Sequence, residues 1–176
     1  MFKLLSDVVL AATVPADWIG IRAVRDASRT CAMRDGHPDA NRWHLDEGAM
    51  VEVLVKGQFG YSATNHLSPA ALAAAVDQAY GQALAASAWA VHRFTPAARP
   101  KATGSSVCAY QQGLDTLPPE RLNELMIKVC HGLQVSEQIV QTSASAKSHD
   151  IETWFVSSNG SEVYQRYCQM WCTGGI

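Results

Sequence analysis

The sequence predicts an α+β protein with a mainly antiparallel sheet and helices packed on one face of that sheet. Tight-turn signals separate strand-like segments in both halves of the chain, which is typical of hairpins. The helical patterns do not alternate singly with the strands. A doubly wound parallel sheet needs a helix between successive strands, so this architecture is disfavoured.

Composition limits the class of protein. The chain has 176 residues, a length typical of one domain. Hydrophobic residues make up 48% and charged residues 17%, which excludes an intrinsically disordered chain. The net charge of −2 provides no basic footprint for nucleic acid, and no apolar run reaches the roughly 18 residues of a membrane span. Composition therefore predicts a soluble globular domain.

The N-terminal segment is predicted to be an amphipathic helix. Its apolar residues recur at helical spacing: Phe2, Leu5, Val9 and Ala12. A secretory signal peptide is the alternative, but Asp7 interrupts the apolar stretch and Lys3 is its only basic residue. We therefore favour the helix.

Three strands joined by tight turns are predicted next. Residues 18–33 and 42–55 are strand-like and flank the turn signal Asp35-Gly36. Lys56-Gly57 then marks a second tight turn before residues 58–63. Two consecutive hairpin signals predict an antiparallel meander.

A long helix is predicted over residues 69–88. Ser68 is a suitable N-cap, and Pro69 fits the first helical position, where the missing N–H costs nothing. The expected apolar stripe consists of Leu72, Val76, Tyr80 and Leu84. Gly81 interrupts the helix at a cost of about 1 kcal/mol relative to alanine.

The second half predicts an irregular connector, a helix and a closing hairpin. Residues 93–116 are rich in proline, glycine, serine and threonine, so we expect a long connector there. A helix starts at Pro118-Pro119 and ends near Gly132, with a stripe of Leu122, Leu125, Val129 and Leu133. Residues 138–146, 152–156 and 161–171 are strand-like, and Asn159-Gly160 is the strongest hairpin signal.

No catalytic constellation is visible in the sequence. It contains no HExxH or HExxxH motif, no GxGxxG motif and no Walker A loop. One group of donors could converge on a cation around a turn: His37, Asp39, His44, Asp46 and Glu47. We favour a solvated hairpin loop for these residues.

The five cysteines also favour a structural interpretation. Their odd number and unrelated contexts indicate reduced thiols and a cytoplasmic location. Cys168 and Cys172 would lie about 13 Å apart on a strand, too far for one metal or one disulfide. Cys130 and His131 are adjacent on a predicted helix, where neighbouring side chains point in different directions.

An ordered series of motifs carries a family resemblance. Arg34-Asp35-Gly36 is followed by EGAMVEVLV from residue 47, KGQFGYSATN from residue 56 and LSPAAL from residue 67. The later stretches QIVQT, from residue 138, and ETWFVSSNGSE, from residue 152, continue the series. The chain resembles the N-terminal domain of the TldD/PmbA family, also called the modulator-of-gyrase family. The sequences of its motifs most resemble those of cyanobacterial members.

The resemblance implies a cytosolic, two-domain metallopeptidase or its paired subunit, acting on unfolded peptides and modified-peptide precursors. Zinc is expected in a C-terminal domain, on an HExxxH helix and a later cysteine. That domain is absent from residues 1–176, so we expect no catalytic residue, metal ligand or cofactor in this chain. Because strand-like residues stop abruptly at Ile176, we expect the chain to be a fragment of a longer protein.

The expected partners are the protein's own C-terminal domain, a second family subunit in a homo- or hetero-dimer, and an unfolded peptide. We expect no membrane contact and no direct nucleic-acid contact. Where the family often has Gly-x-Gly-Val-Arg, residues 48–52 read Gly-Ala-Met-Val-Glu, so the zinc-bearing and zinc-less branches both stay open. The alternative functions are a non-catalytic peptide- or partner-binding module and a gyrase-modulating interaction protein.

Two turns are candidate contact sites for substrate or partner: Arg34-Asp35-Gly36 and Asn65-His66. We expect them at the rim of a chamber whose sheet edge receives an extended peptide as an added strand. Substituting either turn should weaken peptide cleavage by the full enzyme while its zinc content stays the same. Unchanged cleavage kinetics in both variants would contradict this role.

Overall fold

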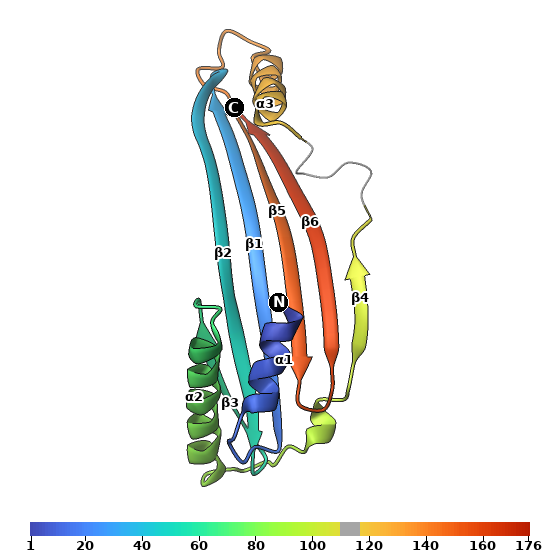
Figure 1. The fold of residues 1–176 in the computed structure, drawn as a ribbon. Helices are drawn as coiled ribbons and strands as arrows, with labels where there is room; N and C mark the ends of the chain where they lie inside the picture. Colours follow the sequence, from blue (N-terminus) through green and yellow to red (C-terminus); the bar gives the residue numbers. More distant parts are fainter. Residues whose placement is uncertain (110–116) are drawn as a thin grey trace. The chain divides into compact units, whose positions relative to one another are not determined.

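The fold is built on one sheet. The structure is a computed structural model that describes residues 1–109 and 117–176. Within these residues it contains a six-stranded sheet of order β3-β2-β1-β5-β6-β4, three α-helices and one short 3₁₀ helix (Figure 1). The strands are β1 (Trp18–Arg34), β2 (His37–Val55), β3 (Gln58–Thr64), β4 (Thr103–Val107), β5 (Ser143–Ser157) and β6 (Glu162–Gly175). The helices are α1 (Phe2–Ala11), α2 (Pro69–Ser87), η1 (Pro96–Ala98) and α3 (Pro119–Leu133).

The sheet is mainly antiparallel, as predicted. Short turns join β1 to β2, β2 to β3 and β5 to β6, and β2 pairs antiparallel with β3 from Ala49↔Thr64 to Val55↔Gln58. β4 is the exception, because it points in the same direction as its neighbour β6 (Figure 1). The predicted α+β class is therefore confirmed.

The chain divides into two compact units, each described by itself below. Unit 1 contains Met1–Arg25, Asp46–Ser106 and Glu152–Gln165. Unit 2 contains Asp26–Leu45, Val107–Ile151 and Arg166–Ile176. The strands β1, β2, β4, β5 and β6 contribute residues to both units.

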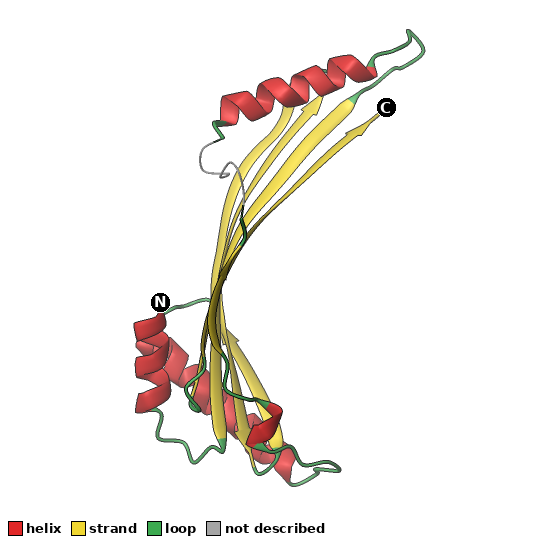
Figure 2. Cartoon of the chain, turned by 90° about the vertical axis from the view of Figure 1, so that its right-hand side faces the viewer, coloured by secondary structure: helices red, strands yellow, loops and turns green. Residues whose placement is uncertain are grey.

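In unit 1, α1 and α2 pack on one face of the sheet (Figure 2). The buried core joins Leu5 and Val9 of α1 to Leu72 of α2 and to Ile21 and Val53 of the strands. Burial of Leu5 and Val9 confirms the predicted amphipathic N-terminal helix. Ser68 caps α2 as expected, because its hydroxyl accepts a hydrogen bond from the N–H of Ala71 at 3.3 Å.

The apolar stripe predicted for α2 is partly wrong. Leu72 and Val76 are buried, but Leu84 is 36% exposed. The contact face is formed instead by three buried alanines, Ala75, Ala79 and Ala83. Larger side chains do not fit there, because the helix lies very close to the sheet. This approach is closest at Gly60, where an added Cβ would lie 2.0 Å from the carbonyl oxygen of Ala79.

In unit 2, α3 packs against the strands through a separate core. Its buried residues are Leu122, Met126 and Cys130, which contact Cys31 and other residues of β1 and β5. The predicted stripe was therefore wrong at Leu125, which is 50% exposed. The thioether of Met126 and the thiol of Cys130 fill this core in place of Leu125.

The hairpin turns follow the sequence signals. Asp35-Gly36 and Lys56-Gly57 both adopt positive φ at each residue, with values from 48° to 81°. This geometry matches the right-handed twist of the strands that the turns join. Gly160 also has positive φ, at 84°, and the predicted Asn159-Gly160 hairpin is confirmed between β5 and β6.

Two predicted segments differ from the structure. Residues 138–142 lie outside any strand, and the segments predicted as 138–146 and 152–156 are one continuous strand, β5. The connector predicted over 93–116 contains η1 and the short strand β4, while its residues 110–116 lie outside the described residues. β4 is a strand because its backbone pairs with β6. Its side chains show no alternation of buried and exposed residues, since all five are exposed.

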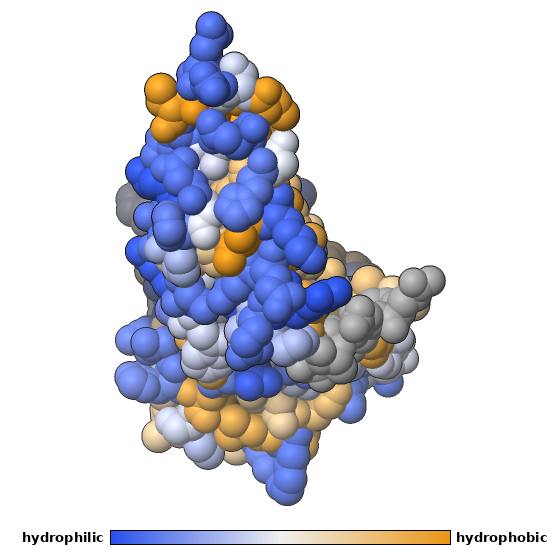
Figure 3. Space-filling view, turned by 90° about the horizontal axis from the view of Figure 1, so that it is seen from above, coloured by the Kyte–Doolittle hydropathy of each residue, from blue (hydrophilic) through white to orange (hydrophobic). Residues whose placement is uncertain are grey.

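The exposed surface carries apolar side chains in separate places. Figure 3 shows a mainly hydrophilic face with separate hydrophobic patches. Exposed apolar residues of unit 2 include Val135 and Val140, at 80% and 95% exposure. No helix in residues 1–109 or 117–176 is long and apolar enough to cross a membrane.

Candidate functional site

The first predicted contact turn lies in unit 2. The N–H of Asp35 donates to the carbonyl of Thr142 at 2.9 Å, and the Asp35 carboxylate accepts from the N–H of Thr142 at 2.7 Å. Arg34 pairs with Asp39 at 3.4 Å, and an added Cβ on Gly36 would lie 2.6 Å from Nε2 of His131. These contacts fix the turn against the rest of unit 2.

The second predicted turn lies in unit 1, between β3 and α2. Asn65 and His66 are exposed, and the N–H of His66 donates to the hydroxyl of Thr64 at 3.1 Å. The two turns therefore belong to different units, and neither unit contains all five predicted residues. Their contact with substrate or partner stays a prediction.

The candidate metal donors do not assemble. Among residues 1–109 and 117–176, no group of three or more histidine, cysteine, aspartate or glutamate side chains could hold a metal ion. All five cysteines are free thiols. Burial raises the pKa of the Cys31 thiol, whose Sγ lies 2.9 Å from Oδ1 of Asn123. This thiol is therefore a packing residue with little thiolate character.

The two edges of the sheet differ in their accessibility. On β3, the Tyr61 N–H donates to Gln82 of α2 at 3.4 Å, and Ser62 contacts Gln78 of the same helix at 2.8 Å. Side chains of α2 thus occupy this edge. On β4, every residue is exposed, and within residues 1–109 and 117–176 the strand order gives it β6 as its only neighbour. An open edge of this kind presents unpaired main-chain groups.

The hydrogen bonds of β4 show which of its main-chain groups point outward. The carbonyl of Ala102 accepts from the N–H of Glu162 at 3.0 Å, and the N–H of Cys108 donates to the carbonyl of Arg166 at 2.9 Å. Even-numbered residues therefore direct their main-chain groups to β6. Because successive residues of a strand alternate, Thr103 and Ser105 direct their N–H and C=O groups away from the sheet.

A groove lies beside this edge, within unit 1. Its volume is about 580 Å³. It is lined by Phe2 of α1, by Thr103, Gly104 and Ser105 of β4, by Glu152 and Trp154 of β5, and by Glu162 and Tyr164 of β6. Phe2 and Trp154 also pack on the unit 1 core, so the groove lies on the face of the sheet that carries the helices.

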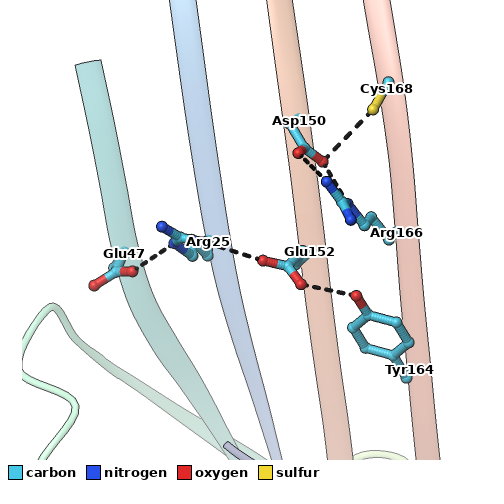
Figure 4. Close-up of polar contacts among 7 residues, drawn as sticks. All are labelled: Arg25, Glu47, Asp150, Glu152, Tyr164, Arg166 and Cys168. Atoms are coloured by element: carbon cyan, nitrogen blue, oxygen red, sulfur yellow. Dashed lines mark hydrogen bonds and ion pairs between the residues drawn. The ribbon is translucent and has the colours of Figure 1, made fainter. Parts of the chain in front are cut away.

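A chain of polar contacts holds the floor of this groove (Figure 4). Arg25 pairs with Glu47 at 3.0 Å and with Glu152 at 3.2 Å. The hydroxyl of Tyr164 donates to Glu152 at 2.7 Å, and the rings of Trp154 and Tyr164 lie 5.6 Å apart. Two aromatic rings and a carboxylate are thereby held in fixed positions from adjacent strands.

Unit 2 contains a separate polar cluster on the same strands. Arg166 forms a bidentate pair with Asp150, with distances of 3.0 and 2.6 Å (Figure 4). The Cys168 thiol donates to Asp150 at 3.6 Å. Burial raises the pKa of Cys168, and the neighbouring Asp150 carboxylate raises it further. A thiol with this environment is a weak nucleophile at neutral pH.

In unit 1, the face of the sheet opposite the helices carries an ion pair that lies against an aromatic ring. Arg99 forms a bidentate pair with Glu52, at 3.0 and 2.5 Å, and its guanidinium lies 4.6 Å from the ring centroid of Phe59. Burial raises the pKa of Tyr61, and the Glu52 carboxylate raises it further while Arg99 opposes the change. Trp18 packs edge-on to Phe59 at 6.3 Å.

The groove residues were missed in the sequence for a physical reason. They come from one helix and three strands, and only the pairing of β5, β6 and β4 brings the strand residues together. The one available signal was the alternation of Glu152 with Trp154 and of Glu162 with Tyr164. Each pair places a carboxylate and an aromatic ring on the same face of its strand.

Comparison with known proteins identifies relatives. Residues 20–83 match the family model described as PmbA/TldA metallopeptidase domain 1. A comparison with curated protein sequences finds no match. A solved structure of a proposed modulator of DNA gyrase from Thermotoga maritima is similar, with a TM-score of 0.69 and 15% identity. It is matched over 98% of this chain and 39% of its own length.

Two further solved structures are similar over the same extent. A proposed modulator of DNA gyrase from Bacteroides thetaiotaomicron has a TM-score of 0.66 and 16% identity, and TldE from Thermococcus kodakarensis has 0.61 and 11%. The match covers 98% of this chain in both cases, but only 39% and 38% of those chains. At these identities the likeness shows the fold. Together with the family match over residues 20–83, it confirms the resemblance of this chain to the N-terminal domain of the TldD/PmbA family.

Proposed function

We propose that this chain is the N-terminal substrate-access and assembly domain of a TldD/PmbA-type zinc metallopeptidase that cleaves unfolded or precursor peptides in the cytoplasm. The family match supports the metallopeptidase context. The residues described in this chain do not fit a zinc site, since no group of three suitable ligands occurs among them. We therefore assign zinc and the chemical step to a further domain, and derive no step through the metal.

The observation that carries this proposal is the open edge of β4. Thr103 and Ser105 direct main-chain donors and acceptors outward, whereas side chains of α2 contact the outer side of β3 at Tyr61 and Ser62. An extended peptide can add to such an edge as a further strand, with affinity from main-chain hydrogen bonds. A folded protein has few free main-chain groups, so this edge selects unfolded chains.

The test removes one outward donor and leaves the pairing with β6 intact. Proline at position 105 lacks the N–H that points away from the sheet, and an edge strand tolerates proline there. We expect Ser105→Pro to weaken binding of fluorescein-labelled, disordered β-casein at least tenfold in a fluorescence anisotropy titration. Ser105→Ala keeps the N–H and should bind as the wild type does.

Two controls make this result specific. Far-UV circular dichroism should be the same for both variants, which shows that the sheet persists. A labelled folded protein of similar size should bind to none of the three chains. Equal casein affinity of Ser105→Pro and Ser105→Ala would refute the strand-addition role of this edge.

A non-catalytic binding module is the second candidate, favoured by the lack of a metal-ligand group in the described residues. In that function the domain positions peptide or stabilises a homo- or hetero-dimer with a family paralogue. Intact mass and zinc content of the endogenous polypeptide separate the two functions. A mass well above that of 176 residues with about one zinc per chain supports the peptidase, and the same mass without zinc supports the zinc-less partner.

A further inference from the structure

We propose that the groove beside β4 binds a lysine or arginine side chain of the peptide that pairs with this strand. The inference rests on the proposed function, because strand addition brings the side chain to the groove. It goes further by naming the class of peptide: extended segments that contain a basic residue. The groove in question is the one of about 580 Å³ on the helix-bearing face of unit 1.

The register of β4 determines which peptide side chains face the groove. The two hydrogen bonds between β4 and β6 place Thr103 beside Glu162 and Ser105 beside Tyr164, with their side chains on the same face. A strand added outside β4 projects every second side chain to this face. Only the small side chains of Thr103 and Ser105 then separate it from the groove.

The distance requires a long side chain. Neighbouring strands lie about 4.8 Å apart, so the added strand runs about 10 Å from β6, where Glu162 and Tyr164 lie. Short side chains cannot cross β4. The flexible stems of lysine and arginine can lie over Thr103 and Ser105 and carry the charged group into the groove.

The chemistry of the groove favours a cation. Glu162 is exposed, and Trp154 and Tyr164 present aromatic rings 5.6 Å apart. A cation gains from a carboxylate partner and from the face of an aromatic ring. Glu152 adds a second carboxylate, which Tyr164 and Arg25 hold in place. Arg25 is the one cation of this group and is shared between Glu47 and Glu152. Together with Glu162, the group therefore carries a net negative charge.

Other side chains fit the groove less well. A long apolar side chain would remove water from the carboxylates of Glu152 and Glu162 without replacing their hydrogen bonds, which costs free energy. A glutamate would meet like charge. The order of preference should therefore be a basic residue first, an uncharged residue of similar length next, and an acidic residue last.

The experiment uses a set of labelled peptides that differ at one central position. The host is an 11-residue peptide of threonine, serine and glutamine, and the central residue is lysine, arginine, norleucine or glutamate. We expect the lysine and arginine peptides to bind the chain about tenfold more tightly than norleucine and more tightly still than glutamate. The preference should decrease at high salt, because the attraction is partly between exposed charges.

Charge variants of the groove provide the decisive comparison. Glu162→Gln should reduce the preference for lysine over norleucine to about twofold or less, and Glu162→Lys should favour the glutamate peptide. Glu137→Gln is the matched control, because it removes an exposed carboxylate from unit 2. It should leave the preference unchanged.

The outcomes separate this inference from the proposed function. If all four peptides bind with equal affinity and Ser105→Pro still weakens them, the cation preference is refuted while strand addition stands. If Ser105→Pro leaves the affinity of every peptide unchanged, both are refuted. A lysine preference that Glu162→Gln does not alter would refute the assignment to this groove.

Discussion

Replacing Gly60 with alanine should destabilise the fold by about 3 kcal/mol, at the upper end of the cost of overpacking. An added Cβ at this position would lie 2.0 Å from the carbonyl oxygen of Ala79 and 2.6 Å from the nitrogen of Ala83. Both are backbone atoms of α2, so no side-chain rotation relieves the clash. The helix must move away from β3, which opens the contact of Leu72 and Ala79 with the sheet.

The matched control is the same substitution at Gly81, in the middle of α2. An added Cβ there has no atom within 4 Å, and alanine favours the helix over glycine by about 0.5–1 kcal/mol. Gly81→Ala should therefore raise the free energy of unfolding. Urea unfolding followed by far-UV circular dichroism measures both variants. Equal stability of Gly60→Ala and the wild type would contradict the close approach of α2 to β3.

Local geometry explains what could be predicted from the sequence. The turns Asp35-Gly36, Lys56-Gly57 and Asn159-Gly160 depend on a backbone conformation that few residues adopt, so their signals are strong in a single sequence. The start of α2 depends on a cap and a proline within two residues. The hairpins and this helix therefore agree with the prediction.

Tertiary pairing explains what could not be predicted. β4 is a strand because its backbone pairs with β6, and its five exposed residues carry no apolar alternation. The contact face of α2 uses alanines in place of Leu84 because the spacing to the sheet at Gly60 is so small. The groove combines residues of four elements, so its carboxylates and rings become neighbours only once β4, β5 and β6 are paired.

Replacing Arg99 with methionine should cost about 2 kcal/mol or more of stability. The Glu52 side chain is only 11% exposed, and its two oxygens accept hydrogen bonds from Arg99 at 3.0 and 2.5 Å. Removing the guanidinium leaves a buried carboxylate without its cation, which typically costs 3–5 kcal/mol. We expect a smaller loss than this range, about 2 kcal/mol, because the Arg99 side chain is 40% exposed and water reaches the site.

A double-substitution cycle separates the ion pair from simple packing. Glu52→Gln removes the charge that Arg99 neutralises, so Arg99→Met in that background should cost less than it does in the wild type. Urea unfolding of the wild type, the two single variants and the double variant measures this cycle. Equal costs of Arg99→Met in the two backgrounds would mean that Arg99 stabilises this face through its contact with Phe59 and not through Glu52.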